Sequence, residues 1–352
     1  MKNRALLQSL ALPAALVAVA VFFTVQESSF LGARNLTQLL IEFSMVGTLA
    51  LGMFLIILTG NIDLSVGSGV GLIGGVAAVL VFQHEWGAPA ALGLGLVAAL
   101  ALWALMGALI VKQHIPSFII TLGGLLVFKG LFWLVIENST VPVARGDEDN
   151  LYSHLTTYYL PHSAGLMLAF ACSVIVGVLA WRGRAARLAH DLPAEPLHRT
   201  LTAPGLVAVV SFGLVFICNQ FRGVPLAVVV LGAATALIYF LTRHTPFGRY
   251  LYAIGGNEEA ARLSGIRVDR VVIGAFALMG AMVAITGFMT TAYSGASTTT
   301  VGELMELDAI AACVIGGTAL KGGRGTVWGV LLGALIMTML LNGMTLMAVA
   351  PE

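Results

Sequence analysis

The residues best placed to do chemistry lie between two apolar runs, in the stretch 60–68 (GNIDLSVGS). Asp63 stands there with the hydrogen-bonding side chains of Asn61, Ser65 and Ser68. A charge at the bilayer centre costs about 2.5–3.5 kcal/mol on insertion scales, so such residues tend to face protein or water. Non-helical backbone near a membrane survives only where side chains, protein or water satisfy it. The stretch therefore predicts a break between helices that does not face lipid. The alternative is that Asp63 or Ser65 simply caps the next helix.

Two further ionisable residues, Glu42 and Lys129, lie inside apolar runs. Buried charges pair with each other or face water, so a Glu42–Lys129 pair is one interpretation and a proton relay is another. A relay usually needs a chain of acids or histidines, which favours the structural pair. Nearby, the run 116–124 (PSFIITLGG) opens an apolar span with polar Ser117 and Thr121.

Motifs for hydrolysis and metal binding are absent from the sequence. The glycine-rich run 316–325 (GGTALKGGRG) contains Lys321, but no Ser or Thr follows it in P-loop spacing. There is no H-E-x-x-H, and all seven histidines fall in loops or at span ends. We therefore expect no catalytic residue, no metal site and no cofactor in this chain. The net charge of +1 gives no indication of a nucleic-acid partner.

The composition predicts an integral membrane protein. Of 352 residues, 59% are hydrophobic and 10% are charged, and mean hydropathy is +0.96, whereas soluble domains carry about 25% charged residues. Apolar runs near the ~20 residues of a membrane helix predict a polytopic, all-α transmembrane bundle. The expected spans are 5–25, 39–59, 66–82, 88–111, 117–136, 164–181, 201–220, 225–242, 271–291, 310–320 and 327–347. The tenth is short enough to be a half-helix or a re-entrant piece.

The distribution of basic residues orients these eleven spans. With the N-terminus in the cytoplasm, fourteen Lys and Arg residues fall inside and three fall outside, namely Arg34, Arg145 and Arg222. The positive-inside rule favours this arrangement over its inverse. The odd number of spans leaves the C-terminus outside.

Short polar segments suggest two further helices with different surroundings. In the cytoplasmic loop 243–270, Asn257 is a good N-cap and Gly265 suits the helix end. A helix of about seven residues is too short to stand alone in water, so it must pack on its own bundle or on a partner protein. Asp308 is a plausible N-cap for the span 310–320, with Glu306 and Asp308 at the outer surface.

Four stretches together resemble the permease subunits of bacterial ABC importers for monosaccharides, the branch with the ribose and xylose permeases. They are 60–68, 116–124, 245–266 (TPFGRYLYAIGGNEEAARLSGI) and 306–329 (ELDAIAACVIGGTALKGGRGTVWG) with the trailing LNGM. The resemblance implies one transmembrane permease domain over the whole chain, in the bacterial inner membrane. It implies as partners a second permease copy, a cytoplasmic ABC ATPase that binds ATP and Mg, and a periplasmic sugar-binding protein. The implied coupling segment comprises Asn257, Glu258, Glu259, Ala260, Ala261, Arg262, Leu263, Ser264 and Gly265.

Two departures from the family pattern matter. Residues 164–224 add two spans and a basic loop that the shorter ribose-type permeases lack, and xylose-type permeases resemble this chain in having them, which favours D-xylose as the substrate. Family members also continue past residues like 340–352 into a last helix, so twelve spans are expected where this chain has eleven. We expect the sugar to pass a polar seam of Asn61, Asp63, Ser65, Ser117 and Thr121. The alternatives are a permease for another sugar such as ribose, a proton-coupled secondary transporter using Glu42, Asp63 and Lys129, and an intramembrane enzyme.

Overall fold

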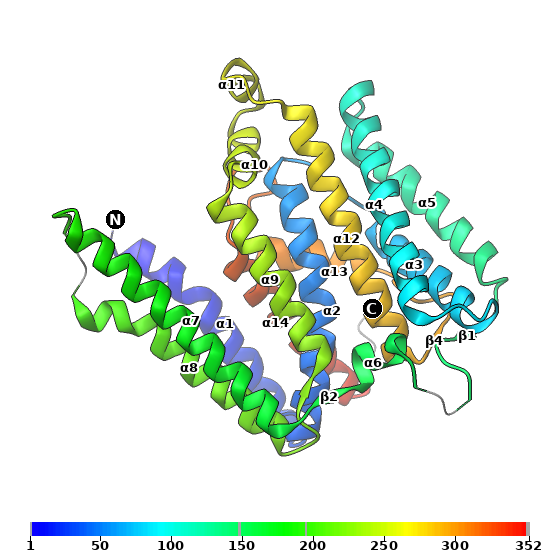
Figure 1. The fold of residues 1–352 in the computed structure, drawn as a ribbon, viewed down its shortest axis with the longest axis horizontal. Coiled ribbons are helices and arrows are strands. Elements are labelled where there is room, and N and C mark those ends of the chain that lie inside the picture. The colour runs from blue at the N-terminus through cyan, green and yellow to red at the C-terminus, as the bar shows by residue number, and fades with distance from the viewer. Residues whose placement is uncertain (1, 147–148, 194–195, 350–352) are drawn as a thin grey trace.

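The computed structural model describes residues 2–146, 149–193 and 196–349, and its fold is almost entirely helical (Figure 1). The long helices are α1 (Lys2–Gln26), α2 (Ala33–Leu58), α4 (Ala88–Gln113), α5 (Ser117–Val135), α7 (His162–Ala189), α8 (Leu197–Asn219), α9 (Leu226–His244), α12 (Val268–Ser294) and α14 (Val327–Leu346). The shorter helices are α3 (Val66–Phe82), α6 (Leu151–Thr157), α10 (Pro246–Gly256), α11 (Glu258–Leu263) and α13 (Met305–Ile315).

Four two-residue strands lie together at one end of the bundle. β1 (Val141–Pro142) pairs antiparallel with β4 (Ala296–Ser297), and β2 (Tyr159–Leu160) pairs antiparallel with β3 (Val224–Pro225). We call this the β end. The opposite end carries α10 and α11 and the turn between α4 and α5, and we call it the α11 end (Figure 1). The β pairs satisfy backbone groups where the chain leaves one helix and enters another.

The helix α2 runs through the middle of the molecule. In the most apolar 18-residue stretch of α2, 89% of the residues are buried, and in the corresponding stretch of α12 67% are buried. An apolar helix that is covered on all sides belongs to a core, so α2 is the element against which the others pack. By contrast, only 11% of the corresponding stretches of α7 and α8 are buried, so these two helices form a peripheral hairpin.

Eight helices in the described part of the chain are long and apolar enough to cross a membrane, and α3 and the stretch Leu12–Gln26 are shorter apolar helices. This confirms a polytopic all-α membrane protein, whereas the count of eleven spans stays a prediction. The cysteines are free, with Cys172 exposed and Cys218 and Cys313 buried.

The short helix α13 differs from the prediction in its position. It covers Met305–Ile315, where the sequence suggested 310–320, and at 11 residues it is about 16 Å long, half of a hydrocarbon core. Asp308 lies inside its first turn and Leu304 takes the N-cap position, so Asp308 as the cap was wrong. Glu306 is buried, which also corrects its expected place at the outer surface.

Glycine lets the halves of the bundle approach closely at α3. A side chain at Gly67 would collide with the Gly302 carbonyl and with Glu306, and one at Gly71 would collide with the Val301 carbonyl and a phenylalanine ring. The segment before α13 therefore lies directly on the first turns of α3. Glycines spaced four apart on α3 thus allow close backbone packing.

Candidate translocation and coupling sites

The break between α2 and α3 is built around the carboxylate of Asp63. Its Oδ1 accepts hydrogen bonds from the backbone N–H of Ser65 at 2.8 Å and from the Ser65 hydroxyl at 2.6 Å. Its Oδ2 accepts one from the indole Nε1–H of Trp103, on α4, at 2.7 Å. All three residues are fully buried. The predicted break is therefore confirmed, and it faces protein.

The helix-capping interpretation was wrong for Ser65, whereas Asp63 does accept a backbone N–H just before α3. Ser65 occupies the N-cap position of α3, but its side chain makes no hydrogen bond to the helix because it donates to Asp63. The Ser68 hydroxyl donates to the Ser65 carbonyl at 3.0 Å. The hydrogen bonds among Asp63, Ser65 and Ser68 thus hold the stretch before α3 in a compact loop. The hydrogen bond from Trp103 to Asp63 attaches this loop to α4.

The first turns of α5 fasten the same break from a second direction. The Ser117 hydroxyl accepts from the Ile62 N–H at 3.2 Å, and the Thr121 hydroxyl donates to the Ile62 carbonyl at 3.3 Å. Asn61 is half-buried and donates to the Thr59 hydroxyl at 2.9 Å. The five residues expected to form a polar seam therefore do lie together, although their role in translocation is untested by these contacts.

Sequence reasoning missed Trp103, the partner of Asp63. A tryptophan in the middle of an apolar span has one N–H that needs an acceptor when it is buried. The available signal for this hydrogen bond was therefore the combination of Trp103 at the centre of one apolar span and a single acid, Asp63, between two others. Neither residue could be matched to the other without the fold.

Glu42 and Lys129 are not paired with each other. The Glu42 carboxylate accepts from the Tyr293 hydroxyl at 3.0 Å and from the Asn342 amide at 3.3 Å. Lys129 forms an ion pair with Glu303 at 3.7 Å and stands 5.4 Å from the centre of the Trp133 ring. The interpretation of a Glu42–Lys129 pair was wrong because α2 and α5 present these groups to different neighbours.

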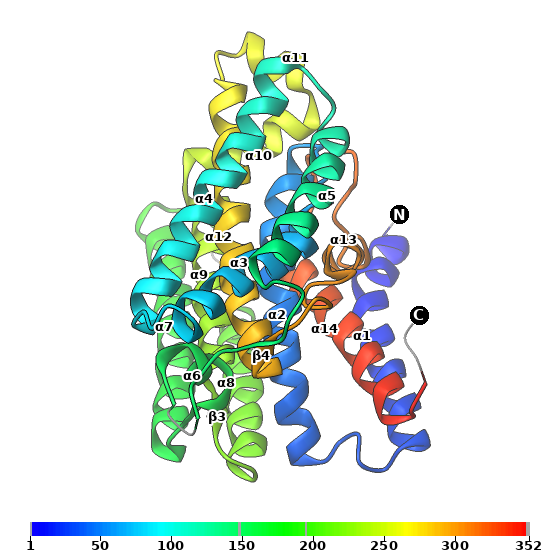
Figure 2. The same ribbon diagram turned by 90° about the vertical axis from the view of Figure 1, so that its right-hand side faces the viewer.

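The ion pair of Lys129 and Glu303 marks an unusual surface on α5. The two side chains remain 43% and 56% exposed, although Lys129 lies roughly 18 Å along the helix from its first residue. Gly123 and Gly130 are exposed on α5, and a side chain added at either position would have free space around its Cβ atom. Charged groups at this depth face protein or water, because lipid would not solvate them. We call the exposed side of α5 with Glu303 the α5 face; α5 stands in front in Figure 2.

The coupling segment forms the short helix α11 at the tip of the molecule. The Asn257 side chain accepts from the Ala260 N–H at 2.9 Å, which confirms it as the N-cap. Gly265, with a φ of +81°, follows the helix end as predicted. Leu263 is 85% exposed, the highest value among the large hydrophobic side chains that the structure describes.

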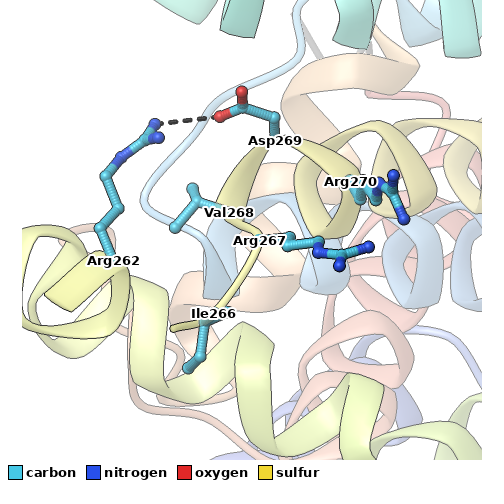
Figure 3. A pocket seen from close by; sticks show the side chains of 6 residues that line it. All are labelled: Arg262, Ile266, Arg267, Val268, Asp269 and Arg270. Carbon is cyan, nitrogen blue, oxygen red and sulfur yellow. Dashed lines mark ion pairs between the residues drawn. The ribbon is translucent and has the colours of Figure 1, made fainter. Parts of the chain in front are cut away.

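The position of α11 is fixed by ion pairs at its base. Arg262 contacts Glu258 at 3.0 Å and Asp269, in the first turn of α12, at 3.1 Å. The hydrogen bond with Glu258, aided by that with Asp269, raises the pKa of the Arg262 guanidinium. The residues between α11 and α12 line an open hollow of about 420 Å³ that carries three arginines (Figure 3). They are Arg262, Ile266, Arg267, Val268, Asp269 and Arg270.

A backbone contact connects the coupling loop with the break. Gly255, in α10, lies so close to the Leu58 carbonyl and the Gly323 backbone that no side chain would fit. The Gly323 N–H donates to the Leu58 carbonyl at 3.0 Å, and the Tyr252 hydroxyl donates to the Gly325 carbonyl at 3.0 Å. Displacement of α10 and α11 would therefore be passed directly to the end of α2, where the break begins.

The sequence is similar to known transport proteins over nearly its whole length. Residues 35–352 match the profile of a family described as branched-chain amino acid transport system / permease component. The chain is 41% identical over 345 residues to the xylose transport system permease protein XylH of Escherichia coli (strain K12), covering 97% of this chain and 86% of that protein. It is 40% identical to XylH of Haemophilus influenzae, covering 95% and 89%. It is 32% identical to the ribose import permease protein RbsC of Escherichia coli (strain K12), covering 98% and 88%. No solved structure matches the chain.

The hydrogen bond from Trp103 to Asp63 predicts a specific loss of stability. Trp103→Phe removes a donor from a buried carboxylate, which costs about 1–3 kcal/mol, and more where the group is charged. We expect a lower midpoint of thermal unfolding for the detergent-solubilised protein. The matched control is Trp86→Phe, because Trp86 is 45% exposed and its replacement should change the midpoint little. Equal midpoints for the two variants would contradict a structural role for this bond.

Proposed function

The chain belongs to the branched-chain amino acid transport system / permease component family, and from this premise we propose that it carries D-xylose across the membrane. Within that family it is an ABC sugar permease, a non-catalytic membrane subunit. The observation that supports xylose is the difference in identity, 41% to a protein named for xylose transport against 32% to one named for ribose import. A permease for ribose is the second candidate.

We place the α11 end of the bundle in the cytoplasm and the protein in the bacterial inner membrane, with the N-terminus inside. The distribution of lysine and arginine supports this orientation. A cytoplasmic ABC ATPase, which holds ATP and Mg, then binds at α11. A periplasmic sugar-binding protein docks at the β end and delivers the sugar.

The proposed coupling route runs along contacts already described. Closure of the ATPases moves α11, and the contact of Gly255 with the Leu58 carbonyl passes this movement to the end of α2. The break around Asp63 follows, because it continues directly from α2. Asp63, Ser65 and Thr121 are buried and hold the break in register with α4 and α5. Alternating access is then a change in the angle between these helices.

The sugar passes along the α5 face in this proposal. That face offers exposed charge at membrane depth, and hydroxyl groups of a sugar can hydrogen-bond to both members of the Lys129–Glu303 pair. Asn61 and Ser117 lie at its α11 end. A single copy leaves this face open, so a second copy of the chain, opposing it across a two-fold axis, closes the pathway.

Reconstituted transport tests the substrate. The protein in liposomes with its ATPase and binding protein should take up radiolabelled D-xylose faster than ribose, and uptake should cease when ATP is omitted. Uptake that continues without ATP would instead support the proton-coupled transporter. Faster uptake of ribose would assign the chain to the second candidate.

Leu263 provides a test of the coupling site. Leu263→Ala should weaken binding of the ATPase about tenfold or more, because burial of a leucine side chain contributes about 1.5–3 kcal/mol. Binding is measured by titration of the ATPase against the permease in nanodiscs. The control is Leu31→Ala, because Leu31 is another exposed leucine, at 52%, but it precedes α2 at the β end. An unchanged affinity for Leu263→Ala would place the ATPase elsewhere.

Cysteine cross-linking tests the opposing copy. In a Cys172→Ser background, which removes the exposed thiol, Gly123→Cys or Gly130→Cys should yield a covalent dimer on oxidation, since a disulfide needs Cα atoms within about 7 Å. Gly213→Cys, on α8, is the control, because it is equally exposed with nothing within 4 Å. A dimer for Gly213→Cys alone would move the second copy to the α7–α8 hairpin.

A further inference from the structure

The α7–α8 hairpin has no part in the proposed transport route, and its attachment to the bundle is limited to one end. Its buried residues are Gly165 and Ala169 of α7 with Val215 and Cys218 of α8, all near the β end. There they pack with Leu40 of α2. Figure 1 shows the opposite end of the hairpin, where α7 passes to α8, standing away from α9 and α10. The buried residues that the structure describes in α7 and α8 thus leave this free end outside the packed bundle.

The free end of the hairpin is basic. Residues 181–200 contain Arg182, Arg184, Arg187 and Arg199 against two acids, Asp191 and Glu195, the second of which lies outside the described residues. An open hollow of about 300 Å³ lies between the two helices there. Its lining comprises Ala180, Gly183, Arg184, Arg187, Arg199 and Thr200. Three arginines from two helices thus line one small concavity, and arginine is the side chain best suited to bind an anion with several oxygen atoms.

The depth of this hollow matches the surface of a bilayer. Helix α7 begins at His162 beside β2 at the β end, and by Arg182, twenty residues later, it is about 30 Å long along its own axis, comparable with the thickness of a hydrocarbon core. The residues between are apolar and mostly exposed. The arginines therefore emerge where lipid head groups lie.

Exposed apolar side chains surround the arginines. Trp181, Leu188, Leu192 and Leu197 are 59%, 54%, 56% and 49% exposed. Tryptophan is enriched at the membrane interface, and leucines beside arginines suit the boundary between acyl chains and head groups. A soluble partner would leave α7 and α8 themselves still in contact with lipid, whereas a lipid satisfies the leucines and the arginines together.

We propose that the hollow between Arg184, Arg187 and Arg199 binds the phosphate of an anionic phospholipid of the cytoplasmic leaflet. The lipid fixes the free end of the hairpin against the membrane, with its acyl chains along the exposed sides of α7 and α8. The site requires the orientation given above but is independent of the sugar that is transported.

Lipid binding by the full-length purified protein tests this proposal. Fluorescent phosphatidylglycerol is titrated onto the protein in uncharged detergent at low salt. Each basic residue near an anionic surface contributes about fivefold to affinity, so Arg187→Gln with Arg199→Gln should weaken binding about 25-fold. Arg182→Gln is the control, because Arg182 lies in the same turn of α7 as Arg184 but does not line the hollow. Arg187→Lys with Arg199→Lys keeps the charge and should restore most of the binding.

Several outcomes would overturn the site. Equal losses of affinity for the single variants Arg187→Gln and Arg182→Gln would reduce the arginines to diffuse charge. Displacement of the lipid by an excess of inorganic phosphate alone would assign the hollow to a free anion. A double variant that loses affinity for the ATPase but keeps its affinity for phosphatidylglycerol would assign the hollow to the protein partner. Because no sugar is present, a wrong substrate assignment leaves this result unaffected.

Discussion

A carboxylate removed from water needs hydrogen-bond donors, and Asp63 finds them on α4 and in its own loop. This requirement fixes the register of three elements at once. The break must reach α4 so that Trp103 can donate, and α5 must begin where Ser117 and Thr121 meet the backbone of Ile62. The α2–α3 break is consequently a defined structure inside an apolar bundle, and α3 starts from it at a fixed angle to α2.

The same break lies beside α10, which leads into the segment that we propose couples the permease to its ATPase. Gly255 and Gly323 approach the last carbonyl of α2 without any side chain between them. A backbone-to-backbone contact of this kind transmits displacement with little slack, because packed interiors deform little. On α3, Gly67 and Gly71 admit the segment before α13 equally closely. Glycine contacts thus hold α10 against the end of α2 and the segment before α13 against α3.

Charge at the membrane-facing surface is distributed according to what surrounds it. The α5 face places Lys129 and Glu303 within the depth of a span, where an opposing copy or water has to solvate them. The α7–α8 hairpin is apolar along its length and places its arginines only at the end, where head groups solvate them. A single rule, the cost of charge in hydrocarbon, therefore distinguishes a side of the molecule whose charges need protein or water from a hairpin that is apolar along its length.

The sequence determined the features that depend on composition and local pattern. The apolar runs fixed the all-α class, Asn257 and Gly265 fixed the ends of α11, and the glycine and aspartate stretch at 60–68 marked a break. Only the tertiary structure decided which groups meet. Trp103 and Asp63 are forty residues apart, Lys129 takes Glu303 in place of Glu42, and α13 begins five residues earlier than its apolar run suggested. Apolar periodicity reports that a residue is shielded from water, but the partner of a buried polar group is set by helix packing, which one chain segment does not encode by itself.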